Sequence, residues 1–219
     1  ELARLCAIGK LLVVSGAARG VDRIAMGACL ENGGAAIGLV ADGLERIIVE
    51  RETRRALDDD RLCLLSPYLP SAPFNVGNAM NRNKCIYVLA DYAVVVDSAL
   101  GKGGTWQGAL ENLKHAWTPL FVRIGENACA GNRELVQRGG IPLSARDFRK
   151  DRPLKSILEM AVERQRAHEP EQDDLLALAE RMASGVEKGG TTEATSDHKN
   201  GAETTTTIIS KMTSTAHGQ

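Results

Sequence analysis

The fold is decided by residues 11–40, whose sequence is LLVVSGAARGVDRIAMGACLENGGAAIGLV. The first four residues are continuously apolar, as in a strand that is buried on both faces of a sheet. A loop with glycines follows, and then a stretch with the apolar spacing of a helix, from about Asp22 to Asn32. Gly33 and Gly34 end this helix, and residues 36–40 are again apolar. The segment therefore predicts a strand, a helix and a second strand.

The same alternation continues along the chain. It predicts helices at 51–60, 78–89, 106–117 and 131–140, and strands at 62–65, 93–97 and 119–124. This order is typical of a mostly parallel sheet with helices on both faces and right-handed crossovers. We therefore expect a Rossmann-like α/β domain over residues 1–145. Ligands of such open sheets bind beyond the carboxyl ends of the strands.

The pattern changes after Pro142. Residues 153–168 predict a helix, Pro170 breaks it, and a second helix is expected at about 173–182, which gives a helical extension over residues 151–183. The tail from 184 to 219 is rich in Gly, Thr, Glu and Lys, and its only apolar spot is Ile208 and Ile209. Because so little apolar surface cannot offset the entropy of ordering, we expect the tail to be disordered.

The composition limits the kind of partner. The chain has 27 basic and 28 acidic residues, a net charge of -1, so nucleic acid must be bound by a local patch or by backbone amides. Aromatic residues are only 4% of the chain, which disfavours recognition of bases mainly by stacking. No apolar run is long enough to span a membrane and no signal peptide is visible, so we expect a cytoplasmic protein. Because Glu1 is not an initiator Met, we also expect further residues upstream.

The five cysteines predict no metal site. None forms a C-x-x-C pair, and no His lies at metal-ligand spacing from them. Unpaired cysteines inside apolar runs are typical of buried free thiols in a reducing compartment. These residues are Cys6, Cys29, Cys63, Cys85 and Cys129.

Three loops at predicted strand or helix ends are candidates for binding phosphate. In the first, residues 15–22, glycines permit a ligand to approach the backbone, and the following helix offers free amides and a positive dipole end. The second, at 81–84, places two cations and two amides at the start of a helix that is apolar further on. The third, at 101–105, combines glycines with a lysine and a threonine. An ordinary glycine turn remains the alternative for the first loop, and a solvated helix face remains the alternative for the second. The candidate binding residues are Ser15, Gly16, Ala18, Arg19, Gly20, Asp22, Arg82, Asn83, Lys84, Lys102, Gly103, Gly104 and Thr105.

Known nucleotide motifs are not matched. The third loop lacks the G-x-x-x-x-G-K-[ST] pattern of a P-loop, and the first lacks G-x-G-x-x-G. We therefore predict no cofactor.

At these residues the chain resembles the DprA/Smf family of DNA-processing proteins. SGAARGVDRIAMGACLENGG is similar to the family's S-G-x-A-x-G-[IV]-D-x-x-A-H-x-x-A-L-x-x-G-G stretch. LLSPYLPSAPF, NRNKCIYVLADYAVVVDS, GGTWQGALENLKHAWTPLFV and GNRELVQRGGIPL are similar to later blocks of the family, in the same order. The resemblance extends from about Leu2 to Leu143.

The resemblance implies a Rossmann-like protein that is not an enzyme. Family members bind single-stranded DNA, usually as dimers, and load a RecA-type recombinase onto it during DNA uptake and recombination. On the matching positions, Arg19, Arg82, Asn83 and Lys84 would contact phosphates. The serine, glycines and threonine of the first and third loops would line the pocket.

This chain departs from the family pattern in several places. Met26 stands where the family usually has His, and Pro67 replaces an acidic residue. The family's first strand, with its G-[ST]-R loop, has no counterpart here. The C-terminal segment does not match the winged-helix domain that many members carry.

Two other functions of the same superfamily are alternatives. The first is a phosphoribohydrolase-like enzyme, because residues 102–105 are loosely similar to the P-G-G-x-G-T motif of that group. Asp97 and Glu111 are its candidate carboxylates, although neither has a clear general-base partner in the sequence. The second alternative is a sensor of a nucleotide signal.

Overall fold

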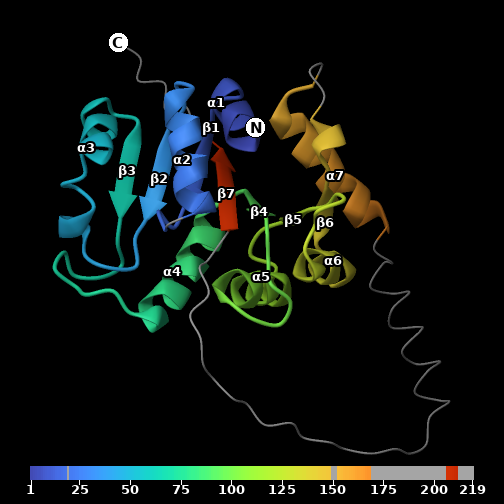
Figure 1. Ribbon diagram of the computed structural model, residues 1–219. Helices are drawn as coiled ribbons and strands as arrows, with labels where there is room; N and C mark the ends of the chain where they lie inside the picture. Colours follow the sequence, from blue (N-terminus) through green and yellow to red (C-terminus); the bar gives the residue numbers. More distant parts are fainter. Residues whose placement is uncertain (19, 149–151, 169–205, 212–219) are drawn as a thin grey trace, which may run out of the picture.

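The structure, a computed structural model, describes residues 1–18, 20–148, 152–168 and 206–211 (Figure 1). The strands are β1 (Leu11–Ser15), β2 (Ala36–Leu39), β3 (Leu62–Leu65), β4 (Tyr92–Val95), β5 (Leu120–Arg123), β6 (Ile141–Leu143) and β7 (Thr206–Lys211). The α-helices are α1 (Leu2–Ile8), α2 (Val21–Glu31), α3 (Arg51–Asp58), α4 (Val76–Leu89), α5 (Gly104–His115), α6 (Ala130–Gln137) and α7 (Leu154–His168). Short 3-10 turns lie at Leu44–Arg46 and Ala145–Asp147.

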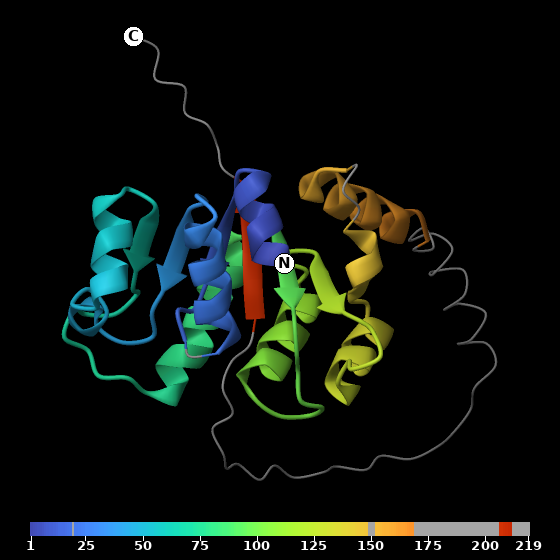
Figure 2. The same cartoon turned by 45° about the horizontal axis from the view of Figure 1, so that its top comes forward.

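The strands form a seven-stranded sheet in the order β3-β2-β1-β7-β4-β5-β6. All pairs are parallel except those that β7 makes with β1 and β4. The chain places β1, β2 and β3 toward one edge and then β4, β5 and β6 toward the other, so the strand order reverses between β1 and β4 (Figure 2). In open α/β sheets, such a reversal is where ligands bind.

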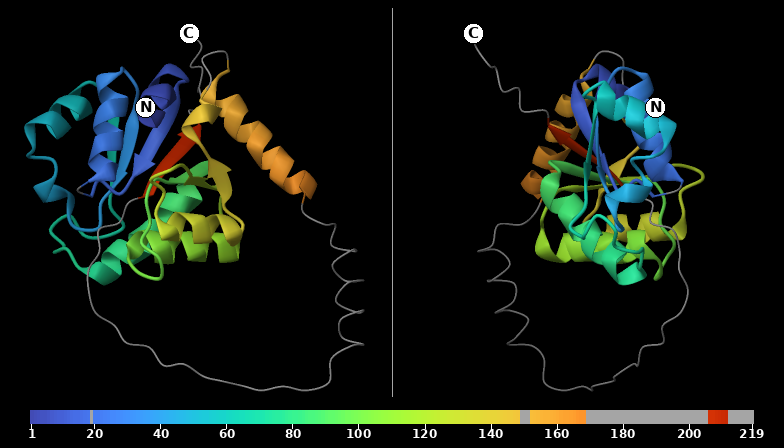
Figure 3. Two further views of the ribbon diagram at one scale, coloured as in Figure 1. Left: turned by 45° about the vertical axis from the view of Figure 1, so that its right-hand side comes forward. Right: turned by 90° about the vertical axis from the view of Figure 1, so that its left-hand side faces the viewer.

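Helices cover both faces of the sheet (Figure 3). On one face, α1, α2 and α7 pack against strand residues such as Val13 and Val94. On the other face, α4, α5 and α6 pack against residues such as Val14 and Val95. Successive residues of one strand therefore enter different cores, which explains why these strands are apolar at every position. The predicted Rossmann-like α/β class is confirmed, and the helix predicted at 153–168 is α7.

The tail differs from its prediction at residues 206–211. We expected no regular structure there, but these residues form β7. The short apolar pair at Ile208 and Ile209 gave only a weak local signal. The partners of β7, however, are two strands whose backbone groups would otherwise be unpaired on their facing edges. The second helix predicted at about 173–182 and the rest of the tail lie outside the described residues.

The cysteines are free, but only two are fully buried. Cys6 and Cys29 have no exposed surface, and burial raises the pKa of the Cys6 thiol to about 12. Cys63 on the edge strand β3 and Cys129 at the start of α6 are exposed, which corrects the prediction of burial for them. None of the described helices combines the length and apolar character that crossing a membrane requires.

Candidate phosphate-binding site

The loop between β1 and α2 reaches the carboxyl edge of the sheet, where the strand order reverses. Gly20 precedes α2 with φ of 89° and ψ of -133°, a conformation essentially restricted to glycine. Gly16 is buried, Ala18 is half-buried and Gly20 is exposed, so this loop rises from the core to the surface. Arg19 lies outside the described residues. The first turn of α2 supplies the amide groups and the positive dipole end that the sequence predicted here.

Arg82 lies beneath this loop rather than on the surface. Its side chain comes from α4, is only 2% exposed, and donates through Nη1 to the carbonyl oxygens of Gly16 and Leu39. A guanidinium can therefore join the ends of β1 and β2 by binding their carbonyl groups. The prediction that Arg82 contacts DNA phosphate is corrected, because the backbone of the protein already occupies its Nη1 donor and the group is covered.

Asp22 is the second buried charged group at this position. It is 1% exposed, and burial raises its pKa from 3.8 to about 6, against the opposing influence of the Ser15 hydroxyl and the Arg82 guanidinium. Burial likewise lowers the pKa of Arg82, and the Asp22 carboxylate partly offsets that change. Asn83, also predicted to contact phosphate, is 4% exposed. Ser15, Asp22 and Arg82 thus form a polar layer that supports the loop from below.

The loop between β4 and α5 approaches the same edge from the other side of β7. Gly103 precedes α5 with φ of 88° and ψ of 162°, which again requires glycine. Gly104 and Thr105 are buried in the first turn of α5, whereas Lys102 is exposed. Within the described part of the chain Lys102 forms no ion pair. This loop therefore offers a helix start together with an ammonium group that is free to meet an anion.

Lys84 lies two residues beyond Arg82 on α4, and its side chain reaches α5. Its ammonium lies 2.7 Å from Glu111 Oε1, and 45% of its side chain is exposed. Glu111 is seven residues beyond Gly104, roughly 10 Å along α5. The other candidate carboxylate, Asp97, lies 3.5 Å from the Arg123 guanidinium at the end of β5. The two carboxylates predicted for a hydrolase are thus engaged with different cations on different elements.

A further set of polar contacts at the carboxyl edge of the sheet was not predicted from the sequence. Arg123 Nε donates to Val96 O at 2.7 Å, and Asn132 Nδ2 donates to Val96 O and Arg123 O. A Cβ on Gly131 would collide with Ser98 O, so α6 starts directly against the segment that follows β4. The signal was available, because Arg123 lies at the end of the strand predicted at 119–124 and Asn132 follows that strand. Their role is to fasten β4, β5 and α6 together.

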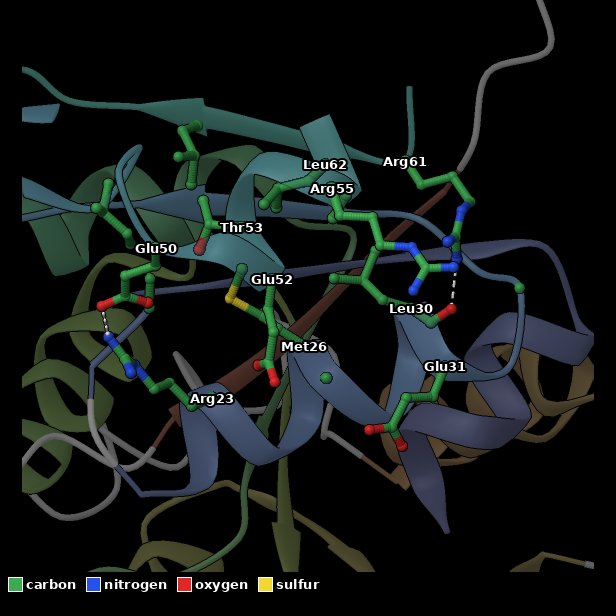
Figure 4. A pocket seen from close by; sticks show the side chains of 16 residues that line it. Arg23, Met26, Leu30, Glu31, Glu50, Glu52, Thr53, Arg55, Arg61 and Leu62 are labelled. Atoms are coloured by element: carbon green, nitrogen blue, oxygen red, sulfur yellow. Dashed lines mark hydrogen bonds and ion pairs between the residues drawn. The ribbon is translucent and has the colours of Figure 1, made fainter. Parts of the chain in front are cut away.

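A groove of about 670 Å³ lies between α2 and α3 (Figure 4). Its lining includes Met26, at the position where the family usually has His, together with Leu30 and Leu62. Arg23 on its rim is bound to Glu50 at 2.7 Å, and Arg61 donates to Leu30 O. Arg55 also lines the groove, but Arg23 and Arg61 already have partners and three carboxylates, Glu31, Glu50 and Glu52, stand beside them. The groove is therefore a poorer match for phosphate than the loops at the carboxyl edge.

The chain matches a family of known proteins. The model of the DNA recombination-mediator protein A family matches residues 1–150. Protein Smf of Escherichia coli K12 is 32% identical over 133 residues, which are 59% of this chain and 35% of Smf. The chain thus spans about a third of the length of this curated relative.

Two solved structures share the fold. DNA processing protein A of Streptococcus pneumoniae has a TM-score of 0.54 and 23% identity, and the match covers 64% of this chain and 50% of that protein. DNA processing protein A of Helicobacter pylori has a TM-score of 0.56 and 25% identity, with 72% and 71% covered. The latter structure concerns a single-stranded DNA binding mode.

Proposed function

This chain belongs to the DNA recombination-mediator protein A family, and from that membership we propose that it binds single-stranded DNA. The Helicobacter pylori relative, whose structure concerns such binding, supports the proposal. The resemblance of the loops to DprA/Smf motifs, on which the sequence prediction rested, supports it as well.

One observation supports a particular surface of the protein as the place where the DNA binds. Two helices, α2 and α5, start at the carboxyl edge of the sheet, on either side of the reversal in strand order. Each is preceded by a glycine with φ near 90°, Gly20 or Gly103. Paired helix starts of this kind place free amides and positive dipole ends where two phosphates of one strand can lie.

The polar residues divide into two groups in this proposal. Buried Ser15, Asp22 and Arg82 hold the first loop in shape and do not touch DNA. The contacts come from the amides of the helix starts and from Lys102, with Lys84 as a further surface cation. Arg19 is included on the basis of the sequence. Binding of this kind neutralises phosphates without reading bases, so it depends on salt and not on sequence.

The role in the cell is a further part of the proposal. By its family, the protein acts in recombination and DNA uptake in the cytoplasm, as a homodimer that delivers single-stranded DNA to a RecA-type recombinase. It is a binding protein in this proposal and not an enzyme.

The test is a fluorescence anisotropy titration with single-stranded and double-stranded oligonucleotides of unrelated sequences at two salt concentrations. We expect tighter binding of the single strand, equal affinity for different sequences, and weaker binding at higher salt. Binding that is unaffected by salt would contradict the phosphate contacts.

Two other functions found in the superfamily, nucleotide sensing and phosphoribohydrolase activity, predict different experimental results. A thermal-shift panel of free nucleotides identifies a nucleotide sensor if one nucleotide stabilises the protein more than an oligonucleotide does. Release of free base from a nucleoside monophosphate identifies a phosphoribohydrolase. Either result would replace the proposed function.

A further inference from the structure

The two halves of the sheet are joined through β7. In the described sheet β1 pairs with β2 and β7, while β4 pairs with β5 and β7, so β1 and β4 do not pair with each other (Figures 1 and 2). One half carries the β1–α2 loop and the other carries the β4–α5 loop. The backbone link between the two halves of the candidate site is therefore a strand from the C-terminal segment.

The register of β7 pairs its two isoleucines with strand residues that belong to the two hydrophobic cores. On the β1 side, Ile209 is the Cα partner of Val13, and Ile208 is the partner of Val14. Val13 and Val14 belong to the two different cores on the two faces of the sheet. The β4 partners of these isoleucines pack in the same two cores; they are Tyr92 and Ala93. Ile208 and Ile209 are thus paired with apolar residues on both neighbouring strands.

The direction of β7 relates it to the proposed DNA surface. Because β7 is antiparallel to its neighbours, its first residues lie at their carboxyl ends. Thr207 is the partner of Ser15, the last residue of β1, and Thr206 is the partner of Val95, the last residue of β4. Neighbouring strands lie about 4.8 Å apart, so an inserted strand separates β1 from β4 by roughly 10 Å.

We propose that Thr206–Lys211 is a positioning element of the DNA site, one that sets the distance between the two phosphate-binding loops. This inference rests on the proposed function. With β7 in place, the loops hold one spacing and can engage two phosphates of the same strand. Without it, the facing edges of β1 and β4 present unpaired backbone groups, and only helix packing, such as that of α4 against α5, holds the spacing of the loops.

Cross-linking tests the place of β7 in the full chain. The pair Leu12→Cys and Ser210→Cys joins register partners, whose Cα separation of about 4.5–5.5 Å suits a disulfide. The control pair, Leu12→Cys and Thr207→Cys, is displaced by three residues, roughly 10 Å along the strand. We expect mild oxidation to cross-link the first pair and not the second. Equal cross-linking of both pairs, or of neither, would overturn the placement of β7.

DNA binding by the same protein tests the positioning role. We expect the oxidised Leu12→Cys and Ser210→Cys protein to bind a single-stranded oligonucleotide within twofold of its reduced form, because the cross-link holds the strand where the site needs it. Ile209→Pro, which removes a backbone donor from the middle of β7, should weaken binding at least tenfold. Loss of binding on cross-linking would overturn the proposal, because it would show that β7 must leave the sheet.

The outcomes separate the two proposals. If Ile209→Pro does not fold, loss of binding in the oxidised protein still overturns the positioning role. If neither wild type nor the cross-linked protein binds DNA, the proposed function fails and the positioning role with it. An incorrect cross-linking pattern in a protein that does bind DNA overturns the role of β7 alone.

Discussion

The guanidinium of Arg82 lies so close to Gly16 that a Cβ at this glycine would be 2.6 Å from Arg82 Nη1. The contact joins the middle of α4 to the first residue after β1, 66 positions away in the sequence. It makes the conformation of the β1–α2 loop depend on a buried charge that the loop itself does not contain.

We therefore expect Arg82→Met to destabilise the protein by about 3 kcal/mol. The carbonyl groups of Gly16 and Leu39 would lose their donor, and Asp22 would lose a neighbouring positive charge. Urea unfolding measures the change. Arg23→Ala is the matched control, since its exposed ion pair with Glu50 contributes less than about 1 kcal/mol. Similar losses in both variants would contradict the structural role of Arg82.

The raised pKa of Asp22 predicts a particular pH dependence. Its folded pKa of about 6 lies above the ordinary value of 3.8, so the folded state binds more protons than the unfolded state between these values. Stability should then fall by about 2–3 kcal/mol as the pH rises from 4 to 7. Asp22→Asn should lack this loss and be the more stable protein at pH 7. Thermal unfolding of both proteins at pH 4.5 and 7.5 checks this, and an equal pH response would refute it.

Lys102→Gln should weaken binding of single-stranded DNA by roughly fivefold, or about 1 kcal/mol, for every sequence tested. Loss of one phosphate contact should also reduce the slope of log affinity against log salt by about 0.7. Lys114→Gln is the control, because Lys114 is an exposed residue in the last turn of α5, the helix that Lys102 precedes. An equal effect of the two substitutions would place the DNA elsewhere.

Lys84→Gln should have a smaller effect than Lys102→Gln, because Glu111 already neutralises much of the Lys84 charge. The converse change is informative. Glu111→Gln should release the ammonium group and raise the affinity for DNA, an increase that Lys84→Gln should abolish. Anisotropy titrations of the single and double variants measure this coupling. If Glu111→Gln leaves the affinity unchanged, Lys84 is not part of the DNA surface.

Gly103→Ala should cost about 1–3 kcal/mol and weaken DNA binding, because its φ of 88° with ψ of 162° strains any residue that has a Cβ. Gly27→Ala, in the interior of α2, should instead stabilise the protein by about 0.5–1 kcal/mol, since nothing lies within 4 Å of the added Cβ. Opposite shifts in melting temperature are the expected result. A stabilising Gly103→Ala would mean that the loop adopts another conformation.

The layered fold followed from local patterns. Apolar runs such as residues 11–14 and 93–95, separated by stretches with helical spacing, specify strands that are buried on both sides. Glycines at the two loops marked where helices begin, and both loops lie at the reversal of strand order. The spacing of apolar residues identifies these elements because it is repeated over several residues in each strand or helix.

Sequence reasoning failed where one residue depends on distant partners. A cation in the segment NRNK indicates a solvated surface, but carbonyl groups from β1 and β2 make burial of Arg82 possible. No local pattern shows that those carbonyl groups lie nearby. The pairing of Lys84 with Glu111 and the insertion of β7 are likewise tertiary, and the polar composition of residues 206–211 gave no reason to expect a central strand.

The two buried thiols, Cys6 and Cys29, can serve as an internal probe of how the molecule opens. They lie in α1 and α2, and with a pKa of about 12 the Cys6 sulfur is almost never a thiolate at neutral pH. A thiol reagent that modifies Cys63 and Cys129 at once should reach Cys6 only when α1 separates from the sheet. The rate of the slow labelling phase would then measure how often such openings occur, without an added dye or an engineered residue.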